Sequence, residues 1–201
     1  MARPQPDLFG NTGWPDGFAY RDTVLSAADE ADLVRRIETL PFEPFEFHGY
    51  LGKRRVVSFG WRYDYAGHAL GESTAAPDFL LPLREAAAAT FAGLEADGLR
   101  QILVTEYAPG AGIGWHRDKP MFEDVVAFSL LAPCTLRFRR ARSAGAGWER
   151  AKAEVAPRSA YLLRGAARTQ WYHSIPPVAA LRYSITLRNF ADREAVTPSR
   201  G

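Results

Sequence analysis

The chain has 201 residues, of which 47% are hydrophobic, so it is long enough for one folded domain and too apolar for a disordered chain. Its net charge of +2 is compatible with a local basic patch but does not by itself indicate nucleic-acid binding. No apolar run approaches the ~18 residues that span a bilayer, and the first residues lack the apolar stretch of a signal peptide. The single cysteine, Cys134, excludes an intramolecular disulfide. We therefore expect a cytoplasmic protein without a membrane partner.

In chain order, the first predicted elements are helical. Ser26 is a suitable N-cap for a helix that continues to Leu40, because apolar residues recur along it at helical spacing. Residues 54–59 then favour a strand. A second helix is predicted over residues 77–96, where an alanine run supplies strong helix propensity and Gly98 is a suitable stop.

Beyond residue 100 the pattern changes to short runs that favour β structure, separated by turns at roughly even intervals. These runs are Gln101–Tyr107, Val125–Leu130, Thr135–Phe138, Ser159–Leu163, Gln170–His173 and Arg182–Arg188. Many short strands favour a sandwich or a barrel. We predict an α+β, mainly β chain: an N-terminal extension with two helices (1–99), a double-stranded β-helix or jelly-roll core (100–192) and a C-terminal tail (193–201), together one structural domain.

Three side chains have the types and spacing of a metal site. If the chain is extended at His116 and Asp118, both point to the same face, because side-chain direction repeats every two residues. His173, near another strand end, would be the third ligand. Two histidines and one carboxylate on one side of a metal leave open positions, as non-haem iron(II) oxygenases require. An isolated H-x-D motif arises by chance in roughly a quarter of such chains, and a single histidine is more often a core or surface residue.

The last predicted strand carries polar side chains on one face. Alternation places Arg182, Ser184, Thr186 and Arg188 together, opposite an apolar face. An arginine inside a barrel requires an anionic partner, because a buried unpaired guanidinium is costly. A dicarboxylic acid such as 2-oxoglutarate is one candidate, since arginine binds carboxylates with two hydrogen bonds. The alternative is an amphipathic edge strand whose polar face is solvated.

These motifs together resemble one known family. The stretch 105–118, the H-x-I-x-P sequence at His173 and the R-x₅-R run from Arg182 to Arg188 are similar to the core of the AlkB family of nucleic-acid dealkylases. The resemblance covers residues 101–190, about half of the chain. It implies a double-stranded β-helix that uses Fe(II), 2-oxoglutarate and O₂, with a nucleotide-recognition lid before the core.

The same resemblance assigns roles to individual residues. It implies that Tyr107, Arg182 and Arg188 contact 2-oxoglutarate, with Arg182 at the distal carboxylate and Arg188 nearer the keto-acid end. Thr105 and Ser184 stand where family members often carry asparagine, and both replacements keep a hydrogen-bonding group. We therefore include Thr105 and Ser184 among the expected cosubstrate contacts.

The resemblance also implies a substrate: an alkylated base in DNA or RNA, demethylated oxidatively as in alkylation repair. An enzyme that acts on a base must take the base out of its stack and hold it between flat surfaces. The aromatic stretch that contains Trp61, Tyr63 and Tyr65 is the candidate lid, and Arg54 and Arg55 are candidate phosphate contacts. The alternative for these aromatics is packing in the N-terminal core.

Two other functions fit the sequence. The chain could be a 2-oxoglutarate oxygenase that acts on a protein or a small molecule, which the low net charge permits. It could also be a non-catalytic metal-binding β-barrel module, although a structural metal site would not require the arginine run. A basic segment at residues 139–142 precedes a glycine-rich stretch and Trp148, and it fits either phosphate contact or a solvated hairpin. No feature indicates an obligate protein partner.

Overall fold

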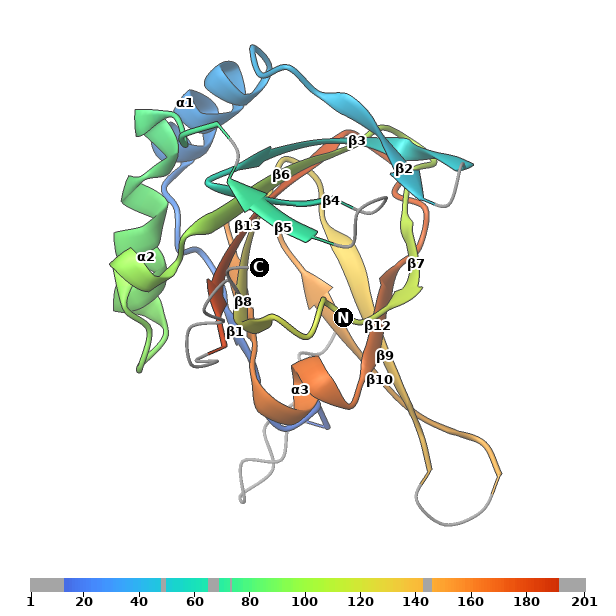
Figure 1. The fold of residues 1–201 in the computed structure, drawn as a ribbon. Helices are drawn as coiled ribbons and strands as arrows, with labels where there is room; N and C mark the ends of the chain where they lie inside the picture. The colour runs from blue at the N-terminus through green and yellow to red at the C-terminus, as the bar shows by residue number, and fades with distance from the viewer. Residues whose placement is uncertain (1–12, 48–49, 65–68, 73, 143–145, 192–201) are drawn as a thin grey trace, which may run out of the picture.

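The computed structural model describes residues 13–47, 50–64, 69–72, 74–142 and 146–191 (Figure 1). The helices are α1 (Ala27–Ile37), α2 (Pro82–Thr90) and α3 (Gly165–Thr169), with two 3-10 helices, η1 (Asp78–Leu80) and η2 (Ala96–Gly98). The strands are β1 (Phe18–Arg21), β2 (Glu43–Phe47), β3 (Tyr50–Phe59), β4 (Trp61–Asp64), β5 (Ala69–Glu72), β6 (Gln101–Tyr107), β7 (Ile113–His116), β8 (Phe122–Leu130), β9 (Cys134–Ala141), β10 (Trp148–Val155), β11 (Ala160–Leu163), β12 (Tyr172–Ile175) and β13 (Arg182–Phe190).

Two antiparallel sheets face each other and form the predicted double-stranded β-helix. The large sheet has seven strands in the order β1-β11-β8-β13-β6-β3-β2, and the small sheet has four in the order β10-β9-β12-β7. Strands β4 and β5 make a separate two-stranded sheet. β structure is not confined to residues after 100, because β1, β2 and β3 all pair into the large sheet. The boundaries proposed at residues 99 and 192 stay predictions.

Alternation along the central strands of the large sheet separates two apolar clusters. On β8, Val126 and Phe128 pack with the helices, whereas Val125 and Ala127 face the space between the sheets. On β13, Ile185 packs with the helices, so the polar residues between the apolar ones face the interior, as predicted. Helices α1 and α2 cover one face of the large sheet (Figure 1). The polar side chains of β13 therefore face the space between the two sheets.

The first helix begins where the sequence predicts. Ser26 is its N-cap: the Ser26 hydroxyl accepts a hydrogen bond from the Asp29 backbone N–H, and the Asp29 carboxylate accepts one from the Ser26 backbone N–H. This reciprocal capping box satisfies two of the N–H groups that a helix start leaves free. The helix ends at Ile37, three residues before the predicted end at Leu40.

The second predicted helix, residues 77–96, is wrong in its extent. The chain forms η1, then α2, and leaves the helix at Phe91, whose backbone is extended. Phe91 and Leu94 are both buried in the cluster beneath the helices. Burial of these two side chains outweighs the helix propensity of the alanine run. Gly98 is not the helix stop, because it lies within η2.

Most of the later strands match their predicted positions, and β6 spans the predicted residues from end to end. The run predicted at residues 170–173 is displaced, since β12 begins at Tyr172 and continues to Ile175. Strands β1, β2, β4, β5 and β10 were not predicted. The extended stretch considered at His116 and Asp118 corresponds to β7, which ends at His116. None of the helices in the described part of the chain is long and apolar enough to cross a membrane.

Candidate active site

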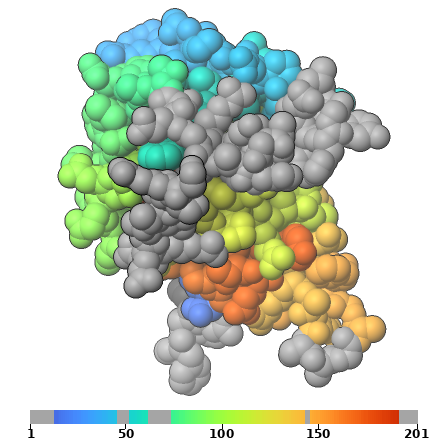
Figure 2. Space-filling model, viewed as in Figure 1, coloured from blue at the N-terminus to red at the C-terminus, as the bar shows by residue number. Residues whose placement is uncertain are grey.

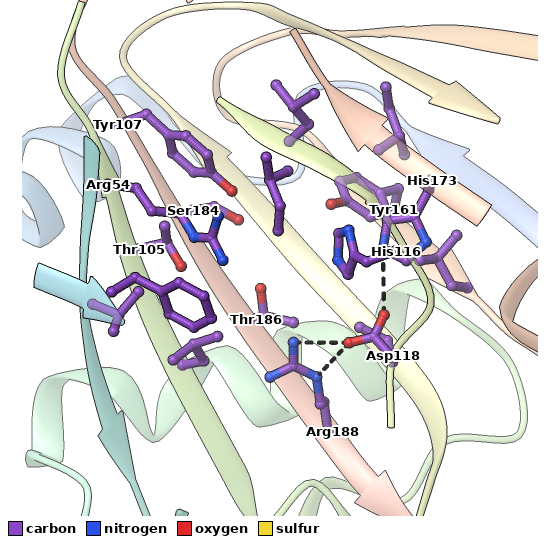
Figure 3. Close-up of a pocket in the computed structure, with 18 residues that line it drawn as sticks. Arg54, Thr105, Tyr107, His116, Asp118, Tyr161, His173, Ser184, Thr186 and Arg188 are labelled. Carbon is purple, nitrogen blue, oxygen red and sulfur yellow. Dashed lines mark hydrogen bonds and ion pairs between the residues drawn. The ribbon is translucent and has the colours of Figure 1, made fainter. Parts of the chain in front are cut away.

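A cavity between the two sheets brings together most of the predicted site residues (Figure 3). Its walls come from β2, β3, β6, β7, β8, β9, β11, β12 and β13, so residues from both halves of the chain meet there. The polar residues that line it are Arg54, Thr105, Tyr107, His116, Asp118, Tyr161, His173, Ser184, Thr186 and Arg188. The predicted strand alternation therefore placed the R-x₅-R face on the correct side of the sheet.

The three predicted metal ligands converge at one end of this cavity. His116 and His173 are directly opposite each other in the antiparallel β7–β12 pair, and their ring centroids are 4.2 Å apart. Asp118 lies two residues beyond β7, and its Oδ2 is 3.4 Å from His173 Nε2. One ligand atom from each residue falls within 4.8 Å of the other two. Two histidines and one carboxylate at this separation fit a single metal ion with open positions.

The hydrogen bonds around these residues leave the expected metal-ligand atoms available. His116 Nδ1 lies 2.9 Å from the Gly114 carbonyl oxygen, which can only accept, so Nδ1 carries the proton and Nε2 keeps its lone pair. Arg188 donates to Asp118 Oδ1 from Nε at 3.2 Å and from Nη2 at 3.0 Å. The other carboxylate oxygen, Oδ2, faces His173 (Figure 3). His116 Nε2 and Asp118 Oδ2 therefore each keep a free lone pair, and His173 Nε2 lies 3.4 Å from that Oδ2.

The electrostatics give the protonation states that a metal site requires. Burial lowers the pKa of His173 to about 4, and the charge of His116 acts in the same direction. Burial likewise lowers the pKa of His116. Burial alone would raise the pKa of Asp118, but Arg188 and the two histidines outweigh it and lower that pKa. Near neutral pH the site thus holds two neutral imidazoles and one carboxylate, the forms that bind metal.

A glycine allows the two histidine strands to approach each other. A Cβ built on Gly112, just before β7, would lie 2.6 Å from the Ile175 carbonyl oxygen at the end of β12. At Gly114 a Cβ would meet no atom within 4 Å. Gly112 is therefore required for close backbone contact, whereas Gly114 is not. Gly112 lies in the stretch that carries the family resemblance, but its residue type and spacing alone do not predict this contact.

Arg182 begins β13, six residues before Arg188, which bonds Asp118, and it is fully buried. It is not among the residues that line the cavity. None of its three guanidinium nitrogens has a hydrogen-bond partner among the described residues. Its guanidinium carbon is 5.0 Å from the centre of the Tyr107 ring, and Tyr107 is its directly paired neighbour on β6. A buried guanidinium without a partner is costly, so the site fits an anion that supplies the missing acceptors.

The predicted substrate residues are divided between different environments. Arg54 lines the cavity, whereas its neighbour Arg55 points outward and binds Glu106 through two bonds of 2.8 Å. The Arg55 guanidinium is thus already paired with a carboxylate, and its role as a phosphate contact stays a prediction. Trp61 packs edge-on against Phe190 with ring centroids 5.6 Å apart. The Tyr63 side chain and Tyr65 lie outside the described residues.

Comparison with known proteins decides the family. The sequence profile described as "2OG-Fe(II) oxygenase superfamily" matches residues 21–188, which is most of the chain. The chain belongs to the 2OG-Fe(II) oxygenase superfamily. Its cofactors are therefore Fe(II), 2-oxoglutarate and O₂, as predicted, and the His-Asp-His group in the cavity agrees with that chemistry.

One curated relative of this 2OG-Fe(II) oxygenase carries an AlkB-type name, which agrees with the resemblance to the AlkB family. An Arabidopsis thaliana protein named "Alkylated DNA repair protein ALKBH8 homolog" is 32% identical over 150 residues, which is 63% of this chain and 42% of that protein. An uncharacterised protein of Acanthamoeba polyphaga mimivirus is 33% identical over 102 residues, 44% of this chain and 47% of that protein. The match thus spans less than half the length of either relative.

Solved structures confirm the fold. The structure of OsALKBH1 superposes with a TM-score of 0.63 at 16% identity and covers 88% of this chain and 97% of its own. A Trichoplax adhaerens prolyl hydroxylase in complex with a hypoxia-inducible-factor peptide gives 0.60 at 16% identity, covering 87% and 84%. A Pseudomonas putida prolyl-4-hydroxylase gives 0.56 at 17% identity, covering 87% and 93%. At these identities the superpositions establish the fold alone.

Proposed function

We propose that this 2OG-Fe(II) oxygenase removes N-alkyl groups, above all methyl groups, from bases in DNA or RNA. The observation that carries the catalytic part is the pairing, in one barrel, of a His-Asp-His group with a buried arginine that has no partner among the described residues. The substrate class is supported by the AlkB-family relatives, one of which is named as an alkylated-DNA repair protein homologue.

In this proposal His116, Asp118 and His173 hold the Fe(II). When bound, Fe(II), 2-oxoglutarate and O₂ together supply the oxidation that turns an N-methyl group into N-hydroxymethyl, with succinate and CO₂ as coproducts. Arg188 holds one Asp118 oxygen and keeps the carboxylate ionised, which leaves the other oxygen for the metal. Loss of formaldehyde from the hydroxymethyl group then restores the base.

Arg182 is proposed to bind the distal carboxylate of 2-oxoglutarate. The cosubstrate would supply the acceptors that the guanidinium lacks among its described neighbours, and bidentate pairing would fix its orientation. Tyr107, Thr105 and Ser184 face the same interior and are proposed as further contacts. Because burial excludes water from this end of the barrel, the ion pair would be stronger there than at the surface.

The base-binding part of the proposal rests on the two-stranded β4–β5 sheet. Trp61 begins β4 and is separated by Gly60 alone from β3, which contributes Arg54 and Val56 to the cavity wall. Trp61 is half-buried and contacts Phe190 on the strand that carries Arg188, so it is tied to the catalytic strand. We propose that Trp61, with Tyr63 and Tyr65, stacks on the extruded base. Arg54 is proposed to contact the anionic part of the substrate or cosubstrate within the cavity.

The deciding experiment measures formaldehyde release from methylated oligonucleotides in the presence of Fe(II), 2-oxoglutarate and ascorbate. A panel of single- and double-stranded DNA and RNA should include at least one substrate that yields formaldehyde and succinate in equal amounts. Asp118→Ala should yield neither product. Proline-containing peptides form the parallel arm, because prolyl hydroxylases share this fold. Hydroxylation of a peptide without any formaldehyde from oligonucleotides would refute the nucleic-acid assignment.

A further inference from the structure

The outward face of the small sheet carries a concentration of positive charge. On β9, Leu136 and Phe138 are fully buried, so alternation turns Arg137 and Arg139 outward. Arg150 of β10 is directly opposite Arg139, and Lys152 is directly opposite Arg137. Like charges at directly opposed positions of a sheet destabilise it. We call these residues, together with Arg117 beside β7, the basic face: Arg117, Arg137, Arg139, Arg150 and Lys152.

The basic face has few internal counter-charges. Among its five members, and within the described ranges of the chain, only Lys152 has a carboxylate at ion-pair distance, Glu154 at 3.6 Å. Arg137 donates to the Ser174 hydroxyl, and Arg117 donates to the Thr169 carbonyl. Neither of these acceptors carries a charge. The face therefore keeps an excess of four positive charges that an external polyanion could neutralise.

Aromatic rings lie among these cations. The Arg139 guanidinium carbon is 4.5 Å from the centre of the Trp115 ring and 4.4 Å from that of Trp148. Arg117 lies 4.8 Å from the Tyr172 ring. Trp148 remains 37% exposed, which is unusual for a side chain of this size. Cations interleaved with partly exposed aromatic rings are the composition by which proteins bind single-stranded nucleic acid: the cations follow the backbone and bases stack on the rings.

The basic face is connected to the catalytic cavity through one strand. In the small sheet β7 is an edge strand, and it carries His116 on the cavity side and Trp115 on the opposite side. Arg117, which lies between His116 and Asp118 in the sequence, also points to the outward side, where it contacts Tyr172. A nucleic-acid chain bound on the basic face would therefore pass around the β7 edge of the small sheet to present a nucleotide to the cavity.

We infer that the basic face binds the backbone of single-stranded nucleic acid next to the nucleotide that enters the cavity. The inference rests on the proposed nucleic-acid function and extends it by naming the surface that holds the substrate strand. Opposed arginines without carboxylate partners, interleaved aromatics and continuity with β7 all support this occupant. A duplex offers stacked bases that these rings cannot reach, so a single strand is the better fit.

The test measures binding of a fluorescein-labelled oligothymidylate by anisotropy at several salt concentrations. Arg150→Glu is the variant of choice, because Arg150 is exposed and stands opposite Arg139. We expect the Kd to rise at least about fivefold, and the salt dependence of log Kd to become shallower by about 1. The melting temperature should stay equal or rise, since the change replaces a repulsive cross-strand pair with an attractive one.

Arg35→Glu is the charge-matched control: it changes the net charge by the same amount at an exposed position of α1, where it also removes the Arg35–Asp32 ion pair. Helix α1 (blue) and the β9–β10 hairpin (orange) lie at opposite sides of the molecule (Figure 2). The control should bind the oligonucleotide like wild type. Unchanged affinity and salt dependence in Arg150→Glu would overturn the inference. If wild-type protein bound polyglutamate as tightly as oligothymidylate, and Arg150→Glu lost that binding too, nucleic acid would be overturned as the partner.

This binding test separates the inference from the function on which it rests. Binding that depends on Arg150, without formaldehyde release from any methylated strand, would support the basic face and refute the demethylase proposal. Formaldehyde release with binding that is indifferent to Arg150 would refute the basic face and leave the demethylase proposal standing.

Discussion

Arg188 donates two hydrogen bonds to a single oxygen of Asp118, Oδ1, and leaves Oδ2 directed at His173. The guanidinium is itself fixed by Gln101, whose side-chain oxygen accepts a bond of 2.7 Å from Arg188 Nη1. This arrangement orients the carboxylate before any metal arrives. It also places a full positive charge beside a buried acid, which keeps that acid ionised.

Arg188→Gln should weaken metal binding through this contact. Without the guanidinium, burial dominates and the pKa of Asp118 rises. Protons then compete with the metal for the Asp118 carboxylate at a higher pH than in the wild type. We expect an affinity loss of about 10–100-fold near neutral pH, as is typical when the partner of a metal ligand is removed. Anaerobic Mn(II) titration across pH measures the effect.

Arg100→Gln is the control for this variant, because Arg100 stacks on Phe190 nearby without contacting Asp118. It should bind Mn(II) with the wild-type pH dependence. If Arg188→Gln also showed that dependence, Arg188 would have no part in setting the charge of Asp118.

Arg182→Met should separate stability from cosubstrate binding. The substitution removes a fully buried guanidinium whose nitrogens lack partners among the described residues, so the ligand-free protein should gain about 1–3 kcal/mol. The same variant should lose the rise in melting temperature that 2-oxoglutarate causes in the metal-loaded wild type. Thermal melting with and without the cosubstrate gives both quantities.

Arg84→Met is matched to this change, because Arg84 is a partly buried arginine on α2 whose Nε also lacks a partner among the described groups. It should retain the full stabilisation by 2-oxoglutarate. A retained cosubstrate effect in Arg182→Met would remove Arg182 from the proposed binding site.

Gly112→Ala and Gly114→Ala should behave differently although they are two residues apart. A Cβ at Gly112 would lie 2.6 Å from the Ile175 carbonyl oxygen, so β7 must move away from β12 and the two histidines must separate. We expect a stability loss of about 1–3 kcal/mol and weaker metal binding. A Cβ at Gly114 has no atom within 4 Å, so that variant should resemble wild type. Equal metal affinity in both variants would show that the close approach does not position the histidines.

The sequence predicted those parts of the molecule that depend on local pattern. Alternation was sufficient to place Ser184, Thr186 and Arg188 on one side of β13, and the Ser26 cap was recognisable from residue type alone. The second helix was too long in the prediction because helix propensity is local, whereas the burial of Phe91 depends on tertiary packing.

Other features could not be predicted because they depend on pairing between distant segments. Strand β10 contains several Ala and Glu residues, which have low β propensity, and it becomes a strand through its pairing with β9. Side-chain alternation predicts that Arg54 and Arg55 face opposite sides of β3. The register of β3 against β6 determines which of the two enters the cavity. The close approach at Gly112 likewise requires knowledge of where β12 lies.

Anaerobic binding tests most directly whether His116, Asp118 and His173 hold one Fe(II) with room for 2-oxoglutarate beside it. Wild-type protein should bind one Fe(II) per chain and then 2-oxoglutarate, as measured by titration calorimetry. His116→Ala and Asp118→Ala should lose the iron while keeping the folded circular-dichroism spectrum. Stoichiometric, high-affinity iron in both folded variants would contradict the account.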